Sequence, residues 1–329
     1  MHGRSLVTTI ASGVLALALL IALIVIAQVD LSHVLRLLAS VQLLPFAALM
    51  IVTGVHVMLA AEKWRLVERH IAPGAELPRR LCFCFTAIGA AAGQIVPMQV
   101  ATALARSLGA HLVNGSGAVR SALATVFEQS FDIVVVFLCG LASVYCLWRG
   151  DIGWWPVGAV AAFATGFLLA PPMLGVLAAA MERLAKAPTA FGGTIGRFGH
   201  ALAASGLFDA RLTRRLLVLS ALRFVMLWLM TVATTHAVGL NVSSVQIAAA
   251  LPFVVFAMAL AVTPGGVGVN EWAFVAALVA FGVDFETATQ CALVNRVLVG
   301  VAVLMVGALG AILAQVPRRH AVAPGRSAS

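Results

Sequence analysis

The sequence predicts an all-α polytopic membrane protein with about six full transmembrane helices and two oppositely oriented re-entrant helical hairpins. Of its 329 residues, 62% are hydrophobic and only 10% are charged, whereas a soluble domain is about 25% charged. The mean hydropathy is +1.06. So few polar groups could not cover the surface of a soluble protein of this size, so soluble and disordered classes are excluded.

Six apolar segments are long enough to cross a hydrocarbon core of about 30 Å. The first follows a short basic stretch, and it is longer than a signal-peptide core with no small-residue cleavage site after it, so we expect an uncleaved helix. The six predicted spans are Leu6–Val29, Leu44–Ala61, Val119–Leu147, Val157–Ala180, Leu216–Val238 and Thr289–Ala314.

Two further apolar regions are interrupted by helix-breaking residues. Leu81–Leu108 contains Gly93 and Pro97, and Gln246–Gly282 contains the run Thr-Pro-Gly-Gly-Val-Gly at 263–268. Proline lacks an N–H and clashes with the preceding turn, so each region is predicted to form two half-length helices joined at a break. Two broken hairpins that enter from opposite faces are typical of transporters with inverted repeats, which makes an inverted repeat a hypothesis here, although no residue-level repeat is visible.

The basic residues predict the orientation. The net charge is +9, which could suggest nucleic acid, but the charges lie in short clusters between apolar runs. Of 21 lysines and arginines, 17 fall on the side that carries both termini, two fall on the other side and two lie within spans. This positive-inside bias predicts cytoplasmic termini in a bacterial-type inner membrane. Residues 1–316 would form a single membrane domain, and residues 317–329 a basic, disordered cytoplasmic tail.

Two carboxylates lie within an apolar span. Glu128 and Asp132 are four residues apart and therefore share a helix face. One interpretation is that Glu128 lies near the cytoplasmic interface and pairs with Arg120 or Arg106. The other is that the shared face lines a polar cavity at the first hairpin, where repulsion between the carboxylates would allow a proton-coupled step.

The second break carries the strongest local signal. Pro264 ends a half-helix, and Gly265, Gly266 and Gly268 permit unusual backbone angles before a second half-helix begins near Val269. The N–H groups at that helix start would form an anion site, for example for a lipid phosphate. The alternative is a glycine-rich hinge. Glu271 falls in the first turn, where it can cap the helix.

Further polar residues are predicted to complete a binding site. Arg296, next to Asn295, needs a partner in the membrane, either Glu271 or an anionic head group, whereas Arg223 is expected to extend toward the cytoplasmic face. Lys63-Trp64-Arg65 is expected to anchor the second span at the interface. No metal site and no cofactor are expected. The candidate substrate-binding residues are Gln94, Pro97, Arg106, Glu128, Asp132, Pro264, Gly265, Gly266, Gly268, Asn270, Glu271, Asn295 and Arg296.

Five motifs, taken in order, resemble the lysylphosphatidylglycerol synthase transmembrane-region family. They are Glu62-Lys63-Trp64-Arg65, Gly93-Gln94-Ile95-Val96-Pro97, Glu128-x-x-x-Asp132, the segment from Thr263 to Glu271, and Gly282-Val283 followed by Asn295-Arg296. The resemblance covers almost the whole chain. One departure is that the family's Gly-Asp/Glu pair is replaced by Ala101-Thr102, with the basic residue, Arg106, one place late.

The resemblance implies lipid translocation. In bifunctional family members this region is thought to flip an aminoacylated phospholipid that a separate soluble domain makes. No such domain is expected here, so the chain is expected not to be an enzyme and to suit a stand-alone branch such as the hopanoid-associated one. The leading hypothesis is a flippase-like translocase for an anionic or modified lipid. The alternative is a scaffold for lipid-synthesising enzymes of a glycolipid, polyprenyl-lipid or hopanoid pathway, and a homo-oligomer remains open.

Overall fold

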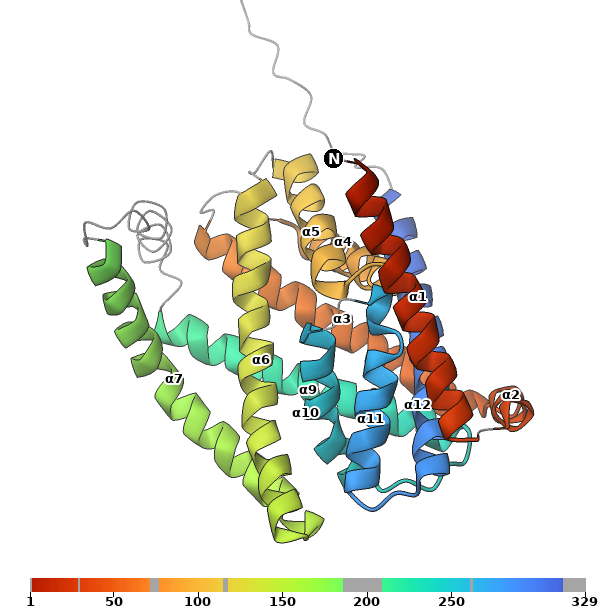
Figure 1. Ribbon diagram of the computed structural model, residues 1–329. Helices are drawn as coiled ribbons and strands as arrows, with labels where there is room; N and C mark the ends of the chain where they lie inside the picture. Colours follow the sequence, from red (N-terminus) through yellow and green to blue (C-terminus); the bar gives the residue numbers. More distant parts are fainter. Residues whose placement is uncertain are drawn as a thin grey trace, which may run out of the picture.

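The described part of the chain is helical throughout, which confirms the predicted all-α membrane class (Figure 1). The computed structural model describes residues 2–28, 30–71, 77–114, 118–185, 209–260 and 263–315. The helices are α1 (His2–Ile26), α2 (Leu31–Ala39), α3 (Leu43–Ile71), α4 (Arg79–Ala92), α5 (Met98–Asn114), α6 (Ala118–Arg149), η1 (Ile152–Trp154), α7 (Trp155–Ala185), α9 (Ala210–Ala237), α10 (Ser244–Leu260), η2 (Pro264–Gly266), α11 (Val269–Ala280) and α12 (Phe285–Gln315).

Five helical segments are long and apolar enough to cross a membrane: Leu43–Ile71, Ser121–Arg149, Ile152–Val176, Ala210–Ala237 and Phe285–Gln315. They coincide with five of the six predicted spans, so the chain is a multi-pass membrane protein. The sixth, α1, has 25 residues, or about 37 Å at 1.5 Å per residue. Its role as a span stays a prediction, because its apolar part among the residues searched is Val14–Ile26.

Both predicted breaks separate antiparallel half-length helices. α4 and α5 have 14 and 17 residues and are joined by the short turn around Pro97, and α10 and α11 have 17 and 12 residues and are joined at η2. The α4–α5 hairpin lies at the end of the molecule where α1 begins and α12 ends, and the α10–α11 hairpin lies toward the opposite end (Figure 1). The two hairpins are therefore opposed, as predicted.

The order and packing of the helices support the inverted-repeat hypothesis. A long helix, a hairpin and a second long helix occur twice, as α3, α4–α5, α6 and as α9, α10–α11, α12. Each hairpin's first helix packs against the last long helix of the other half, α4 on α12 and α10 on α6, and α3 packs against α9. If the two halves are exchanged, the α4–α12 contact becomes the α10–α6 contact and the α3–α9 contact stays the same. The two halves are therefore related by helix order and packing, although their sequences show no repeat.

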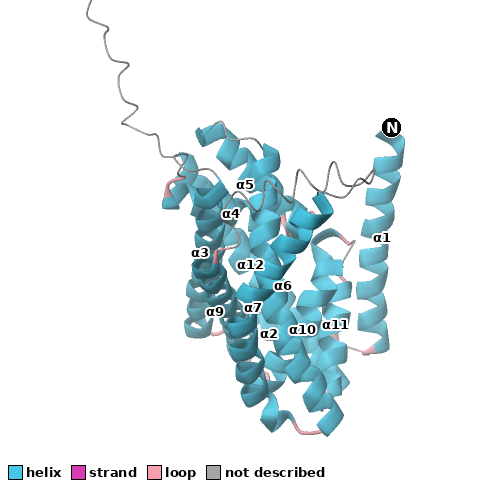
Figure 2. Cartoon of the chain, turned by 90° about the vertical axis from the view of Figure 1, so that its left-hand side faces the viewer, coloured by secondary structure: helices cyan, strands magenta, loops and turns pink. Residues whose placement is uncertain are grey.

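The two hairpins touch each other at their breaks. Gly265 has φ +58°, and a Cβ atom placed on it would lie only 2.4 Å from the backbone oxygen of Gln94 in the first hairpin. Only glycine fits both the backbone angle and this close approach. Helix α1 packs directly against the second break, because a Cβ on Gly268 would lie 2.6 Å from Cβ of Leu19. Figure 2 shows α1 at the edge of the bundle, nearest α11.

The structure corrects the predicted end of the second span. α3 continues ten residues past Ala61, to Ile71, so Lys63 and Trp64 lie well inside the helix, and neither has an exposed surface. The predicted interfacial anchor at Lys63 and Trp64 is therefore wrong. Lys63 and Arg106, both counted as cytoplasmic from the sequence, are buried. Arg65, counted with them, is buried as well. Removing these three from the 17 leaves 14 against two, so the charge bias persists. The predicted tail at 317–329 lies outside the described residues.

Candidate functional site

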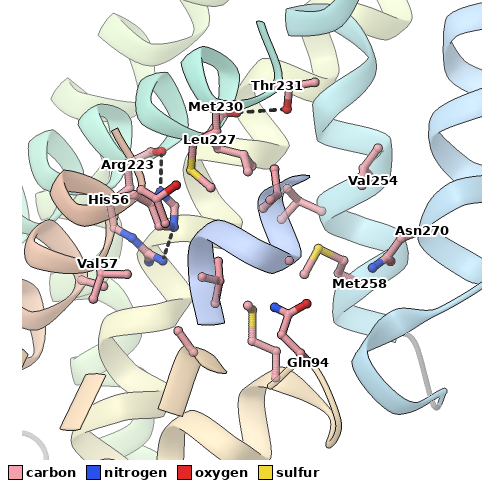
Figure 3. Close-up of a pocket in the computed structure, with 18 of the residues that line it drawn as sticks. His56, Val57, Gln94, Arg223, Leu227, Met230, Thr231, Val254, Met258 and Asn270 are labelled. Atoms are coloured by element: carbon pink, nitrogen blue, oxygen red, sulfur yellow. Dashed lines mark hydrogen bonds between the residues drawn. The ribbon is translucent and has the colours of Figure 1, made fainter. Parts of the chain in front are cut away.

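A cavity of about 200 Å³ lies between the two hairpins and the long helices that carry them. Its lining is divided by chemistry. Charged groups come from α5, α6, α9, α11 and α12, and an apolar wall comes largely from α9 and α10, including Leu227, Val254 and Met258 (Figure 3). A ligand cavity for a whole drug-sized molecule is about 300–1,000 Å³. The volume here suits a lipid head group rather than a whole lipid.

Arg106 of the first hairpin is bound by three other helices. Its guanidinium forms an ion pair with Glu128 on α6 at 2.5 Å, donates to Thr86 Oγ1 on α4 at 3.2 Å, and donates to the backbone oxygen of Ala60 on α3 at 3.0 Å. Its guanidinium carbon lies 5.4 Å from the ring centre of Trp64. Both side chains of the ion pair are 1% exposed. Arg106 therefore fixes α5 to the surrounding bundle. Of the two partners considered for Glu128 from the sequence, Arg106 is the one paired with it here.

Lys63 lies between the two carboxylates of α6. Its Nζ atom is 3.0 Å from Glu128 Oε2 and 2.5 Å from Asp132 Oδ1. A shared cation between two carboxylates offsets their mutual repulsion. The sequence-based premise of two unscreened carboxylates is therefore wrong, and the structure gives that proton-coupled step no support.

Arg223 points inward rather than toward the membrane surface. It pairs with Asp132, and its Nη2 atom lies 3.1 Å from Nε2 of His56, whose Nδ1 atom lies 3.3 Å from the backbone oxygen of Arg223 (Figure 3). The predicted extension of Arg223 to the cytoplasmic face is wrong, because the partly buried carboxylate of Asp132 on α6 supplies its partner. His56 and Arg223 join α3 to α9 where the two halves of the molecule meet.

The second hairpin carries its own ion pair. Glu271 Oε2 accepts the backbone N–H of Gly268 at 2.6 Å and so caps α11, and Glu271 Oε1 lies 3.6 Å from Nε of Arg296. Arg296 also donates to the backbone oxygen of Gly265 at 2.8 Å. The structure thus differs from the simplest form of the predicted anion site, because a carboxylate of the chain itself already occupies part of the α11 helix start.

The ion pairs of the two hairpins are equivalent in position and opposite in polarity. In the first half, an arginine on the second hairpin helix pairs with a glutamate on the following long helix. In the second half, Glu271 on α11 pairs with Arg296 on α12. The first pair is buried, whereas the Arg296 side chain is 27% exposed and its distance to Glu271 is longer. The second hairpin is therefore the more loosely held of the two.

The charges around the cavity do not cancel. Four cations, Lys63, Arg106, Arg223 and Arg296, face three carboxylates, Glu128, Asp132 and Glu271, in the ion pairs described above. One positive charge is left over among these groups. A cationic excess in a low-dielectric site favours an anionic ligand.

The structure brings most of the predicted residues to one cavity. The lining contains Gln94, Arg106, Glu128, Asn270, Glu271, Asn295 and Arg296. Asp132 is not among the lining residues and acts through Lys63 and Arg223. Pro97, Pro264 and the three glycines also lie outside the lining and shape the two breaks. Sequence reasoning gave Lys63 only an anchoring role and missed its ion pairs, because its partner Asp132 is 69 residues away in the chain.

A comparison with known families decides the classification. The model of the lysylphosphatidylglycerol synthase TM region matches residues 10–310. The chain belongs to this family. The resemblance seen in the motifs is thereby confirmed, and a membrane lipid-related function follows from it. Searches of curated proteins and of solved structures return no match.

Proposed function

We propose that the protein is a flippase-like lipid translocase that moves an anionic or modified membrane lipid between leaflets without altering it chemically. The observation that carries the proposal is the amphipathic cavity between two opposed hairpins. Its charged side holds one excess positive charge, and its other wall is apolar. A lipid has the same division, with a charged head group and apolar chains.

The position of the cavity supports transport over a purely structural role. It lies where the two hairpin breaks meet, and each hairpin opens to a different end of the molecule. A site at the meeting point of two inverted halves is the usual place for a transported substrate, because rocking of one half against the other exposes the site to each side in turn. The looser Glu271–Arg296 pair would let the second hairpin move first.

The same proposal includes orientation and partners. We infer that both termini face the cytoplasm of a bacterial-type inner membrane, from the positive-inside bias that remains after the buried cations are removed. The direct partner is a membrane lipid, and enzymes that make it would supply it. The scaffold alternative differs because it requires no lipid movement through the cavity.

Reconstitution into liposomes tests the proposal. The full chain would be incorporated with a fluorescent phosphatidylglycerol, and the lipid exposed on the outer leaflet would be bleached by dithionite over time. The parent chain should raise the rate of lipid exchange above that of empty liposomes. Arg223→Lys keeps the positive charge but loses the planar guanidinium, which has two nitrogens in contact with Asp132 and His56. This substitution should slow lipid exchange about tenfold or more. Arg36→Lys is the matched control, because Arg36 is exposed and pairs with exposed Asp30.

The outcomes separate the two functions. Exchange that depends on the protein and on Arg223 supports the translocase. The translocase is contradicted if lipid exchange is no faster than in empty liposomes while the protein elutes as a folded species and retains its helix content. The scaffold function would then remain. Equal slowing by Arg36→Lys and Arg223→Lys would also contradict the proposed site.

A further inference from the structure

Four carboxamide residues line the cavity. One of them, Gln129, lies next to Glu128 on α6, and the other three belong to the hairpins and α12. Gln94 comes from the break of the first hairpin, Asn270 from the first turn of α11, and Asn295 from α12 beside Arg296. Figure 3 shows Gln94 and Asn270 on the same side of the cavity, with Met258 between them. The three amides therefore come from both halves of the molecule.

Asn270 has unused hydrogen-bonding capacity. The residue is 8% exposed, and its Oδ1 atom has no hydrogen-bond partner among the described residues. A buried amide oxygen without a partner is costly, so such an atom in a cavity wall is a sign of a missing ligand group. Thr234 Oγ1 lies 3.0 Å from the Asn295 oxygen and 2.7 Å from the backbone oxygen of Thr231. A hydroxyl has a single proton to donate, so Thr234 alone does not satisfy the Asn295 amide.

Two glycines lie beside these amides. A Cβ on Gly266, which has φ +68°, would lie 2.3 Å from Nδ2 of Asn270, so any side chain there would displace the amide. Gly300 of α12 faces Gln94, and a Cβ placed on it would lie 3.8 Å from Gln94 Oε1. Gly266 thus leaves the space that Asn270 occupies, whereas Gly300 makes only ordinary contact with Gln94.

The chemistry of the amides restricts the ligand. Oxygens of an ionised phosphodiester only accept hydrogen bonds, so a phosphate alone cannot satisfy Asn270 Oδ1. An ammonium could donate to it, but the excess positive charge around the cavity disfavours a second cation. A hydroxyl group is neutral and both donates and accepts, as a carboxamide does.

We propose that Gln94, Asn270 and Asn295 bind the hydroxyl groups of a polyhydroxylated lipid head group, such as a glycerol or a sugar, while the neighbouring arginines hold its phosphate. This inference rests on the proposed function for the presence of a lipid in the cavity. It adds the class of head group, and it assigns selectivity to neutral amides rather than to the charged cluster.

Equilibrium binding of two anionic lipids tests the inference. Phosphatidylglycerol carries two free hydroxyls, and phosphatidylmethanol has the same phosphodiester charge and none. The purified full chain in detergent micelles should bind a fluorescent-tailed phosphatidylglycerol about tenfold more tightly, the effect of one or two hydrogen bonds. Asn270→Leu and Gln94→Met keep the approximate side-chain shape. Each should lower the ratio of the affinities for phosphatidylglycerol and phosphatidylmethanol to about twofold, with little change in the affinity for phosphatidylmethanol. Gln99→Met is the matched control, because Gln99 is exposed and outside the lining.

Equal affinity of the parent chain for the two lipids would overturn the inference. An equal loss of affinity for both lipids in the two amide variants would overturn it as well. These outcomes are distinct from failure of the proposed function. A chain that prefers phosphatidylglycerol in micelles but exchanges neither lipid in liposomes keeps the head-group site and loses translocation. A chain that exchanges both lipids at equal rates and binds them equally keeps translocation and loses the hydroxyl site.

Discussion

At the scale of single residues, the fold depends on a few positions where the backbone conformation and a close contact coincide. Gly265 is one of them, because it has a positive φ and lies against the backbone of the first hairpin. Gly282 provides a comparison, since it also has a positive φ, +86°, but nothing lies within 4 Å of an added Cβ. Comparing Gly265 with Gly282 therefore distinguishes the cost of backbone strain from the cost of steric contact.

Replacing these two glycines by alanine should have unequal effects. Gly282→Ala should lower the free energy of unfolding by about 1–2 kcal/mol, the strain of a left-handed backbone angle. Gly265→Ala should cost about 1–3 kcal/mol more, because its Cβ would force the hairpin breaks apart. Unfolding in mixed detergent micelles, followed by helix content, measures both. Equal losses would show that the breaks do not touch.

Lys63 is the second decisive residue, because it is the shared partner of buried Glu128 and partly buried Asp132. Lys63→Met should lower the free energy of unfolding by about 3–5 kcal/mol, since it removes the buried cation between Glu128 and Asp132 and leaves each carboxylate with its arginine alone. Adding Asp132→Asn to Lys63→Met should recover part of the loss. Arg36→Met, at an exposed pair, should cost at most about 1 kcal/mol. A Lys63 variant as stable as the Arg36 variant would contradict the ion cluster.

At the scale of the elements, the two hairpins differ in how firmly they are held. The ion pair of the first, Arg106–Glu128, is buried, and Arg106 also binds α3 and α4. The ion pair of the second, Glu271–Arg296, is longer and partly exposed. The close packing of α4 on α12 adds to this difference, because a Cβ on Gly307 would lie 2.4 Å from Cβ of Ala91. The second hairpin is accordingly the element expected to move.

Removing one arginine from each pair tests this asymmetry. Arg106→Met should lower the free energy of unfolding by about 3–5 kcal/mol, because it leaves a buried carboxylate with one fewer cation. Arg296→Met should cost clearly less, because water reaches part of the Arg296 side chain. Hydrogen exchange should also show faster local opening of α11 in Arg296→Met. The reverse order of stability would assign the mobile role to the first hairpin.

At the scale of the whole molecule, the sequence predicted the architecture better than the site. Pro97 and the Pro264–Gly268 run act locally, through backbone chemistry, so both breaks were predictable. The partner of Arg223 was not, because Asp132 is 91 residues away in the chain. Lys63 was missed for a related reason. The predicted span ended before the charged residues Glu62 and Lys63, although the partners of Lys63 on α6 keep this part of the helix within the bundle.

The central claim is that each hairpin enters and leaves the membrane on one side, and that the two use opposite sides. Single cysteines at exposed positions would test it most directly, two at the open end of the first hairpin (Arg79, His111) and two at that of the second (Ser243, Asp284). The native cysteines are all buried and give a low background. An impermeant maleimide on intact cells should leave positions 79 and 111 unlabelled and label positions 243 and 284. A pair whose two positions label from different sides would contradict the account.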